Sequence, residues 1–398
     1  MVVSVGAFRR IFHRLAQTGR SLGAARLSNI QMQRRVAGVL FLVTLGAILV
    51  AGLWPFCAPT NDVSWVRDGI RFGSHGTALS TGNLGSAGLD DETCGLEVWL
   101  QPARTWATGS ILAFYNSSKM RQVVLEQDYT DLVLYRSVAA WDGVVSQSSL
   151  RVPNVFRRQQ AFIAITAAGQ GTSIYIDGQW VLTSPDFRLS AQDLSGQLIL
   201  ANSPFRDHSW SGQMKRLGIY EGELSAPQVV RHYREWPLRG EPSGGSERAL
   251  ALYLFHEQGG SIIHNAVSGG MDLRIPKRFL VLHQMLFESP LTEVHTERSY
   301  GKNALINVAG FVPLGFVASF YFAAFWKMAR AAMAAILVGA ATSFAIEYFQ
   351  SYLPTRYSGL TDTITNTLGA GLGAMLYCAT AGLVTYISQA GRSNTQSG

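Results

Sequence analysis

The sequence predicts a multidomain protein that combines an all-β antiparallel sandwich with an α-helical membrane bundle of four transmembrane helices. The composition is 47% hydrophobic and only 15% charged, which is leaner in charge than the roughly 25% typical of soluble proteins. Four stretches reach the roughly 20 apolar residues that a spanning helix needs. Between the first and second of them lies a long polar segment of short, alternating apolar runs, which is typical of β-strands.

A basic arm, residues 1–35, opens the chain and precedes a membrane anchor at residues 36–56. The arm contains seven arginines and no acidic residue, so the positive-inside rule places the N-terminus in the cytoplasm and the following segment outside. The apolar core of the anchor is too long for a cleaved signal peptide. Arginines can also contact anionic lipid head groups. No aromatic or glycine-rich pattern accompanies them, which argues against nucleic acid as a partner.

The exported segment, residues 57–275, contains short apolar runs such as "LEVWLQP", "DLVLYRSV" and "GQLILANSP", separated by turn residues. This spacing predicts an antiparallel sandwich. Within "YIDGQW", Asp177 and Gly178 supply the positive-φ turn of a tight hairpin.

Several phrases of this segment resemble laminin G-like domains of the concanavalin A-like, jelly-roll group. They are "GIRFG", "LEVWLQP", "IYIDGQWV", "LILANSP" and "WSGQMKRLGIYEGELSAPQVVRHY". The phrase that usually opens such domains here follows the closing helix, over Leu250–Ile275. We expect the sandwich to take this late strand as its own, because an unpaired apolar strand would leave an exposed edge. The resemblance implies binding of a glycan or a protein, or hydrolysis, and the fold does not decide between them.

Carboxylates in the sandwich are candidates for two kinds of site. A glycosidase needs two acids about 5 to 10 Å apart, and the nearest pair is Glu126 and Asp128. The polar run 127–131 indicates a connecting turn, which argues against that pair, and we expect Asp128, Asp131 and Asp177 to shape turns. Some relatives carry Ca²⁺, for which loop carboxylates are suitable ligands. No other metal or cofactor is expected, and no second His or Cys lies at metal-ligand spacing from His283.

Three cysteines occur in the chain. Cys57 and Cys94 both fall in the exported segment, so a disulfide between them is one option in an oxidising compartment, although spacing alone does not establish it. We expect Cys378, in the last span, to be a packing residue.

The juxtamembrane linker, residues 276–303, contains "PKRFLVLHQMLFESP", which is apolar but too short to span a membrane. It either lies at the interface or packs beneath the sandwich. We expect His283 within it to be a surface residue.

Residues 304–387 carry an ordered set of polar motifs within three spans at 304–326, 331–349 and 361–387. The motifs are "NVAGFVPLGF", "IEYFQSYLPTRYSGLTD" and "TNTLGAGLGA". This set is similar to the VanZ-like membrane family, in which an Asn-to-Pro-Leu-Gly element precedes Glu-x-x-Gln, Arg-x-Ser, Asp and Asn-x-x-Gly. A cytoplasmic tail, residues 388–398, follows. The resemblance implies a cell-envelope protein linked to resistance to glycopeptide antibiotics of the teicoplanin type.

The polar residues of the membrane domain form a candidate site. Glu347 and Gln350 share a helix face, and Asp362 and Asn366 share a face of the next helix, so Arg356 in the loop could bridge the two acids. Asn307 and Pro313 could complete the site, because proline frees a backbone carbonyl. Ionisable groups at membrane depth indicate function by default. The alternatives are helix capping and interhelical packing through Gly369 and Gly373.

Two functions are compatible with these features. The first is non-enzymatic: the sandwich binds an envelope glycan or protein, and the bundle anchors it in the inner or plasma membrane, where it holds a lipid head group or an antibiotic. The second is an enzyme in which Glu347, Arg356 and Asp362 act on a lipid-linked phosphate or glycan at the outer face. Both place the two termini in the cytoplasm and the sandwich outside.

Overall fold

The computed structural model describes residues 31–85, 93–118, 121–139, 145–239, 248–284, 286–290 and 300–396. The chain forms two compact units. The sandwich unit comprises residues 57–285 and 353–357, and the helical unit comprises residues 1–56, 286–352 and 358–398. Most of the predicted basic arm lies outside the described residues.

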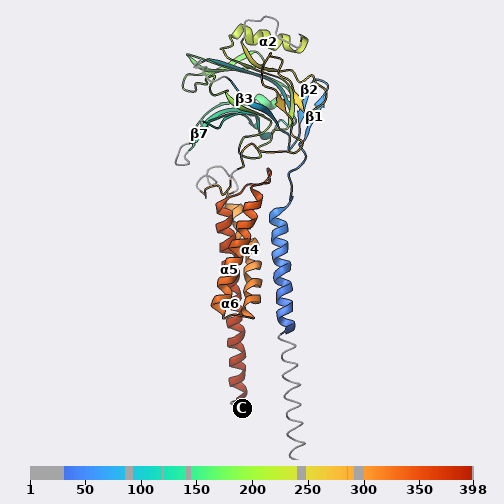
Figure 1. The fold of residues 1–398 in the computed structure, drawn as a ribbon. Helices are drawn as coiled ribbons and strands as arrows, with labels where there is room; N and C mark the ends of the chain where they lie inside the picture. The colour runs from blue at the N-terminus through green and yellow to red at the C-terminus, as the bar shows by residue number, and fades with distance from the viewer. Residues whose placement is uncertain are drawn as a thin grey trace, which may run out of the picture. The chain divides into compact units, whose positions relative to one another are not determined.

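The sandwich unit contains two sheets, in which every neighbouring pair of strands is antiparallel, as the short alternating runs predict. The layered arrangement is visible in Figure 1. The first sheet has the order β1-β2-β13-β4-β9-β10-β11, with β14 also paired to β13. Its strands are β1 (Val63–Val66), β2 (Gly69–Phe72), β4 (Cys94–Pro102), β9 (Ala161–Ala168), β10 (Gly171–Ile176), β11 (Gln179–Ser184), β13 (Gly212–Tyr220) and β14 (Ala249–Tyr253).

The second sheet has the order β15-β16-β3-β12-β5-β6-β7-β8. Its strands are β3 (Ala78–Leu84), β5 (Ala107–Asn116), β6 (Arg121–Tyr129), β7 (Asp131–Ala139), β8 (Val145–Val152), β12 (Gly196–Leu200), β15 (Ile262–Ile263) and β16 (Leu273–Arg274). A short 3-10 helix, η1 (Val155–Arg157), follows β8. The late segment therefore completes both sheets: β14 pairs with β13, and β16 pairs with β3. This confirms that the sandwich takes its missing strand from the C-terminal side.

The core between the sheets is built from the alternate residues of each strand that point inward. Trp210 is 1% exposed, and its indole N–H donates to Gln127 Oε1 at 2.9 Å. The side-chain amide of Gln127 in turn donates to the carbonyls of Arg104 and Tyr129. A polar residue can therefore lie in the core because its hydrogen bonds are made there. The predicted hairpin is also present, with Asp177 at φ 51° and Gly178 at φ 76° between β10 and β11.

Helix α2 (Ala226–Arg239) covers the face of the first sheet that points away from the core (Figure 1). Beneath it, Glu97 and His232 are fully buried. Glu97 Oε2 lies 2.8 Å from His232 Nδ1 and accepts a hydrogen bond from the Tyr220 hydroxyl at 3.1 Å. This polar contact, surrounded by aromatic rings, fixes the helix on the sheet.

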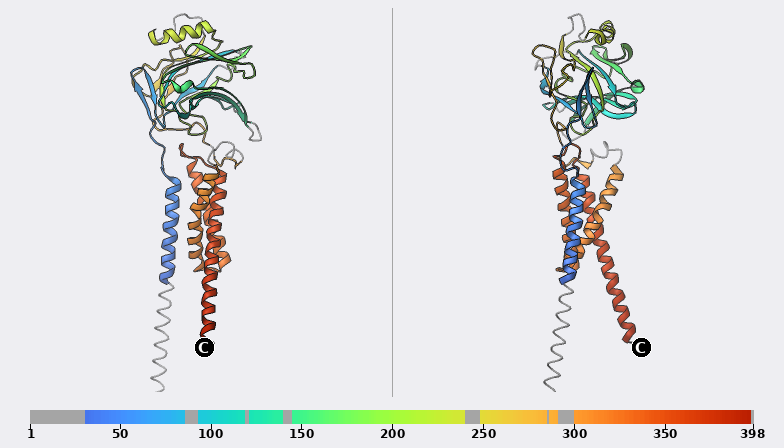
Figure 2. Two further views of the ribbon diagram at one scale, coloured as in Figure 1. Left: turned by 180° about the vertical axis from the view of Figure 1, so that it is seen from behind. Right: turned by 90° about the vertical axis from the view of Figure 1, so that its right-hand side faces the viewer.

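The helical unit contains four helices that are long and apolar enough to cross a membrane. They are Gln31–Leu53, α4 (Tyr300–Ala323), α5 (Met328–Gln350) and α6 (Leu360–Gln396). Figure 2 shows α4, α5 and α6 side by side, with α6 extending past the other two. The segment 388–396 is thus a continuation of the last helix. The first helix joins the bundle, because Phe41, Leu45 and Leu49 pack against Phe311 and Ile346.

Glycines bring α4 and α6 into close contact. A Cβ added at Gly369 would overlap the Val308 carbonyl oxygen, and one added at Gly373 would overlap the Val312 carbonyl oxygen. From the other side, a Cβ at Gly315 would overlap the backbone of Ala370. Small residues permit this backbone approach in membrane helices, so the predicted packing role of Gly369 and Gly373 is confirmed.

Candidate functional site

A cluster of polar side chains surrounds the N-terminal end of α6 in the helical unit. Glu347, near the end of α5, is 2% exposed, and its Oε2 accepts a hydrogen bond from the backbone N–H of Gly359 at 2.9 Å. Gly359 immediately precedes α6. The carboxylate therefore lies where the unpaired N–H groups and the dipole of a helix favour a negative charge.

The neighbouring polar residues pair across the helices. Asn307 Nδ2 on α4 donates to Asp362 Oδ1 in the first turn of α6 at 2.6 Å. One turn later, Asn366 Nδ2 donates to Ser343 Oγ on α5 at 2.9 Å. Gln350 Nε2 donates to the carbonyl of Gly52 at 2.7 Å, which ties the first helix to α5. The faces predicted from residue spacing thus do converge, through pairs that the spacing alone does not specify.

Two of the predicted site residues are not among these pairs. Pro313 is exposed on α4, whereas its neighbours Phe311 and Leu314 are buried, so it does not join the polar cluster. Arg356 falls in Leu353–Tyr357, which belongs to the sandwich unit. The ion pairs predicted between Arg356 and the acids Glu347 and Asp362 would join the two units, and they stay a prediction.

Two further polar residues, Ser343 and Glu288, belong to the cluster and are not among the predicted site residues. Ser343 is fully buried and lies one turn before Glu347, so its helical spacing could have indicated it. Glu288 is 7% exposed, and its backbone bonds to Ser358 and Leu360 place it beside the start of α6. That contact comes from the chain segment before α4 and has no local sequence signal.

One buried hydrogen-bond acceptor of the cluster has no donor within the part of the chain that the structure describes. Asn366 is 5% exposed, and its Oδ1 has no hydrogen-bond partner among the described residues. An unpaired buried acceptor costs about 1–3 kcal/mol, so a donor from a ligand or water would stabilise the bundle there.

A second group of polar and aromatic side chains lies on the outer face of the second sheet, over β6, β7 and β8. The polar run 127–131 predicts a turn, but β6 continues through Tyr129, and only the tip between Tyr129 and Asp131 turns. That interpretation was wrong because Gln127 points into the core, where it pairs with Trp210. Glu126 and Asp128 therefore share the outer face of a strand.

Asp128 on this face is engaged by a cation. Arg151 on β8 forms salt bridges with both Asp128 and Asp131, the latter at 2.9 Å. The backbone N–H of Asn154 and the Arg151 guanidinium together lower the pKa of Asp131. Asp128 thus helps to fix β8 against β6, which favours a structural role for it over proton transfer.

Glu126 has a histidine beside it. His208 Nδ1 lies 3.7 Å from Glu126 Oε2 and 3.2 Å from Ser110 Oγ. Burial lowers the pKa of His208, against the opposing charges of Asp207 and Asp128. The imidazole is therefore mostly neutral near pH 7, and it can exchange hydrogen bonds with hydroxyl groups.

Aromatic rings border the polar part of this face. Tyr135 on β7 is half-buried and packs against Val124. Nearby, Phe205 and His283 surround Tyr115, with ring centroids 4.9 and 4.7 Å from it. His283 is exposed, as the sequence predicts. We call the outer face formed by Gln122, Glu126, Tyr135, Arg151, Phe205 and His208 the outer-face patch.

The cysteines do not form the disulfide considered from the sequence. Cys57 is a free, exposed thiol, and Cys94 is a free, buried thiol on β4. Burial, with a smaller contribution from Asp193, raises the pKa of Cys94 to about 12. The inward orientation of Cys94 in the strand removes it from any partner at the surface.

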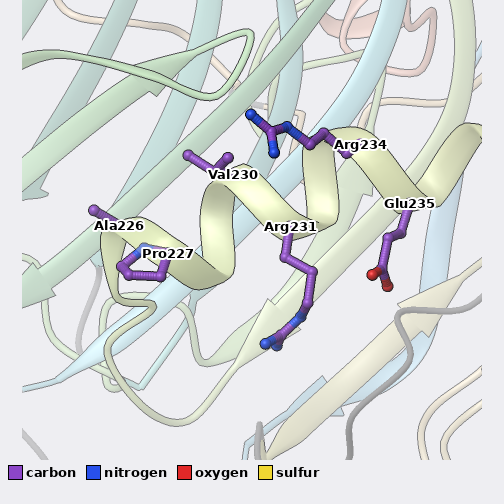
Figure 3. Close-up of a pocket in the computed structure, with 6 residues that line it drawn as sticks. All are labelled: Ala226, Pro227, Val230, Arg231, Arg234 and Glu235. Carbon is purple, nitrogen blue, oxygen red and sulfur yellow. The ribbon is translucent and has the colours of Figure 1, made fainter.

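An open depression of about 490 Å³ runs along α2 (Figure 3). It is lined by Ala226, Pro227, Val230, Arg231, Arg234 and Glu235. All of these side chains come from one helix, and Arg231 and Arg234 point to different sides of it (Figure 3), so nothing converges on a ligand. Within the described ranges, no three His, Cys, Asp or Glu side chains are placed to hold a metal ion.

Comparison with solved structures gives three examples of similar chains. Ruminococcus gnavus IT-sialidase CBM40 is 16% identical over 41% of this chain and 95% of its own, with a TM-score of 0.30. A heptameric SAP-like pentraxin from Limulus polyphemus is 13% identical over 55% of this chain and 93% of its own (TM-score 0.31). The receptor binding domain of botulinum neurotoxin D is 13% identical over 46% of this chain and 48% of its own, with a TM-score of 0.34. A search of curated proteins found no match.

Family models match two parts of the chain. Residues 73–230 match the concanavalin A-like lectin/glucanases superfamily, and residues 250–383 match VanZ/LLP1. The second match begins at residue 250 and so includes β14, β15 and β16, which the structure assigns to the sandwich. The chain is thus a membrane protein in which a concanavalin A-like segment is followed by a VanZ-like segment.

Proposed function

We propose that this protein is a glycan-binding receptor of the cell envelope, in which the sandwich binds the glycan and the helical bundle anchors it. The observation that carries the proposal is the outer-face patch. There the half-buried ring of Tyr135 lies on the same face as Gln122 and Glu126, which offer donors and acceptors. Sugars present apolar C–H faces and hydroxyl groups, so a ring bordered by amides and carboxylates matches their chemistry.

Further support comes from the contacts that fix the side chains of the outer-face patch. Gln122 Nε2 donates to Ser137 Oγ at 2.7 Å across the strands, and Arg151 is held by two carboxylates. These contacts fix the side chains before a ligand arrives, which lowers the entropic cost of binding. The superfamily name of residues 73–230 includes lectins, which is compatible with this function.

A glycan array probed with the full chain in detergent tests the proposal. Wild-type protein should bind a defined set of envelope glycans, and Tyr135→Ala should weaken that binding roughly tenfold or more, the effect of losing a ring contact of about 1–3 kcal/mol. Trp180→Ala is the matched control, because Trp180 is an exposed aromatic residue on β11 of the other sheet. Absence of any glycan binding, or equal losses in both variants, would contradict the proposal.

A second candidate function is an enzyme or lipid-binding site in the helical unit. The observation that favours it is the unpaired buried Oδ1 of Asn366, next to the acids Glu347 and Asp362 at the start of α6. If the cluster is an enzyme site, a lipid-linked phosphate or glycan enters it at the outer face of the membrane, and one of the carboxylates transfers a proton.

Amide variants separate this candidate from a purely structural cluster. Glu347→Gln and Asp362→Asn keep the shape of each side chain, so an enzyme would lose turnover of lipid-linked substrates while inserting normally. If both variants instead fail to assemble, the carboxylates serve the fold, as expected for a cap and an interhelical contact.

The orientation of the chain belongs to the same proposal. The sandwich lies outside the inner or plasma membrane and both termini are cytoplasmic, as the arginines of the arm favour. A membrane-impermeant maleimide applied to intact cells should label the exposed Cys57, and Cys57→Ser should abolish the signal. Labelling that requires permeabilised cells would contradict this orientation.

Resistance to teicoplanin-type antibiotics is one expected consequence for the cell. A glycan-binding receptor at the membrane could alter access of a glycopeptide to its target. Expression of wild-type protein should raise the inhibitory concentration of teicoplanin, and Tyr135→Ala should remove the effect if the sandwich is responsible. An unchanged concentration with wild-type protein would show that the link does not hold for this chain.

A further inference from the structure

The first sheet has a notch where its central strand changes neighbours. On one side of β13, residues Gly212–Met214 pair with β2, and residues Leu217–Tyr220 pair with β14. Lys215 and Arg216 lie between these two pairings. The register of β13 with β4 also shifts between Met214 and Arg216, which is the mark of a β-bulge. Bulges redirect side chains that would otherwise follow the strand.

The notch is shaped by a glycine and a loop. Gly69, which begins β2, has φ 136°, and a Cβ there would overlap the Met214 carbonyl oxygen. Only glycine permits this backbone to approach the bulge so closely. Beyond β14, Phe255 has φ 53°, and the next residue, His256, lines the notch. Segments far apart in the sequence therefore meet at this point.

Positive charge gathers in the notch. It is a cavity of about 230 Å³, and its lining includes Arg67, Lys215 and Arg216 with a single carboxylate, Asp68. Three positive groups and one carboxylate together give a local charge of +2. Burial lowers the pKa of Arg216, against the charge of Asp68, but an arginine stays protonated. The cavity lining thus carries more positive than negative groups, and one of the cations, Arg216, is partly desolvated.

Two neutral side chains that carry N–H groups, Gln160 and Trp99, line the same cavity. Lys215 Nζ donates to Gln160 Oε1 at 3.0 Å, which fixes both side chains. Trp99 is 8% exposed, and its indole N–H is buried without a hydrogen-bond partner among the described residues. Stacking on Tyr233, at 5.6 Å and 14°, holds the indole in place. An unpaired buried donor beside excess cations is satisfied by an acceptor that carries negative charge.

We infer that the notch binds an oxyanion, namely the phosphate or carboxylate group of a small ligand. The cavity is smaller than the roughly 300–1,000 Å³ of common ligand sites, so it holds one charged group and the atoms next to it. It lies on the first sheet, whereas the outer-face patch lies on the second. The inference is therefore independent of the proposed glycan site.

Isothermal titration calorimetry on the full chain in detergent tests the inference, with inorganic phosphate and acetate as separate probes at constant ionic strength. Saturable binding of at least one of them is expected. Arg67→Gln and Lys215→Gln should each weaken it about tenfold or more, because each removes a charge-assisted hydrogen bond. Arg67 is exposed in the turn between β1 and β2, so its variant should fold normally. The probe that binds more tightly identifies the ligand class.

Arg274→Gln is the matched control, since Arg274 is an exposed cation on β16 of the other sheet. It should leave the affinity unchanged. Trp99→Phe keeps an aromatic ring but removes the indole N–H, and it should also weaken binding. The inference is overturned if neither probe binds, if the notch variants bind as wild type does, or if Arg274→Gln weakens binding as much as they do.

Discussion

At the scale of single residues, environment decides which polar groups remain reactive. Cys94 and Cys57 have the same side chain, yet one is buried in a strand and the other is exposed. Glu347 and Asp362 are both acids near the start of α6, but one accepts a backbone N–H and the other a side-chain amide. Their different partners lead us to expect different consequences when each is changed.

Thiol labelling should distinguish the two cysteines of the sandwich. At about pH 8, a thiol with a pKa raised to about 12 is almost fully protonated, and Cys94 is also buried. Maleimide should therefore modify Cys57 in the native full chain and reach Cys94 only after unfolding, as peptide mass spectrometry would show. Modification of Cys94 at a rate similar to that of Cys57 would show that β4 is open to solvent.

Acid should destabilise the sandwich partly through His208. Burial lowers the pKa of His208 below the usual value for histidine, about 6.5, so the unfolded chain takes up the proton first. The stability from the neutral ring is fully present above about pH 6.5 and is lost as the pH falls through the folded pKa. The Tm of the full chain in detergent should therefore fall between pH 7 and pH 5. The fall in Tm should be smaller for the His208→Gln variant than for the wild type.

The matched variant for this experiment is His264→Gln. His264 is an exposed histidine of the sandwich, and it lies 3.3 Å from Asp272. Because the buried His208 is intact in this variant, its Tm should fall between pH 7 and 5 at least as steeply as that of the wild type. A His208→Gln protein whose Tm falls as steeply as that of the wild type would rule out His208 as the source.

At the scale of elements, close backbone approach organises both units. In the sandwich, Gly69 lets β2 meet the bulge of β13, and in the bundle, Gly369 and Gly373 let α6 meet α4. In each case the partner is a backbone carbonyl, which cannot move away as a flexible side chain could. These glycines therefore fix the geometry of the elements that carry the candidate sites.

Filling the helix contact should loosen the bundle. Gly373→Ala places a methyl group against the Val312 carbonyl oxygen, and overpacking of this kind costs about 1–3 kcal/mol. Gly371→Ala is the control, because a Cβ at Gly371 meets no atom within 4 Å. Thermal unfolding of the two variants in detergent should show a lower Tm for Gly373→Ala alone. Equal Tm values would show that α4 and α6 are farther apart than described.

At the scale of the whole molecule, local patterns predict the architecture better than they predict the sites. Apolar length indicates the four helices, and Asp177 with Gly178 indicates a hairpin, because the signal lies within a few residues. The local pattern around Gln127 predicts a turn instead of a strand, because the partner of Gln127, Trp210, lies 83 residues away along the chain. Glu288 likewise has no local signal, because its partners Ser358 and Leu360 lie about 70 residues away, whereas Ser343 lies one turn before Glu347 on the same helix.

The notch of the first sheet shows why charge patterns alone do not reveal a site. Arg67, Gln160 and Lys215 lie in separate segments without a common motif. They meet only because β13 changes neighbours between β2 and β14. Such a site depends on strand order, which the sequence does not state.

We propose that the membrane-anchored sandwich binds a glycan on the outer face of β6, β7 and β8. The most direct test is a cryo-electron microscopy structure of the full chain in nanodiscs with the glycan that binds most tightly on the array. We expect ligand density against Tyr135, Gln122 and Glu126. Density at another surface of the sandwich, or none at saturating glycan, would contradict the claim.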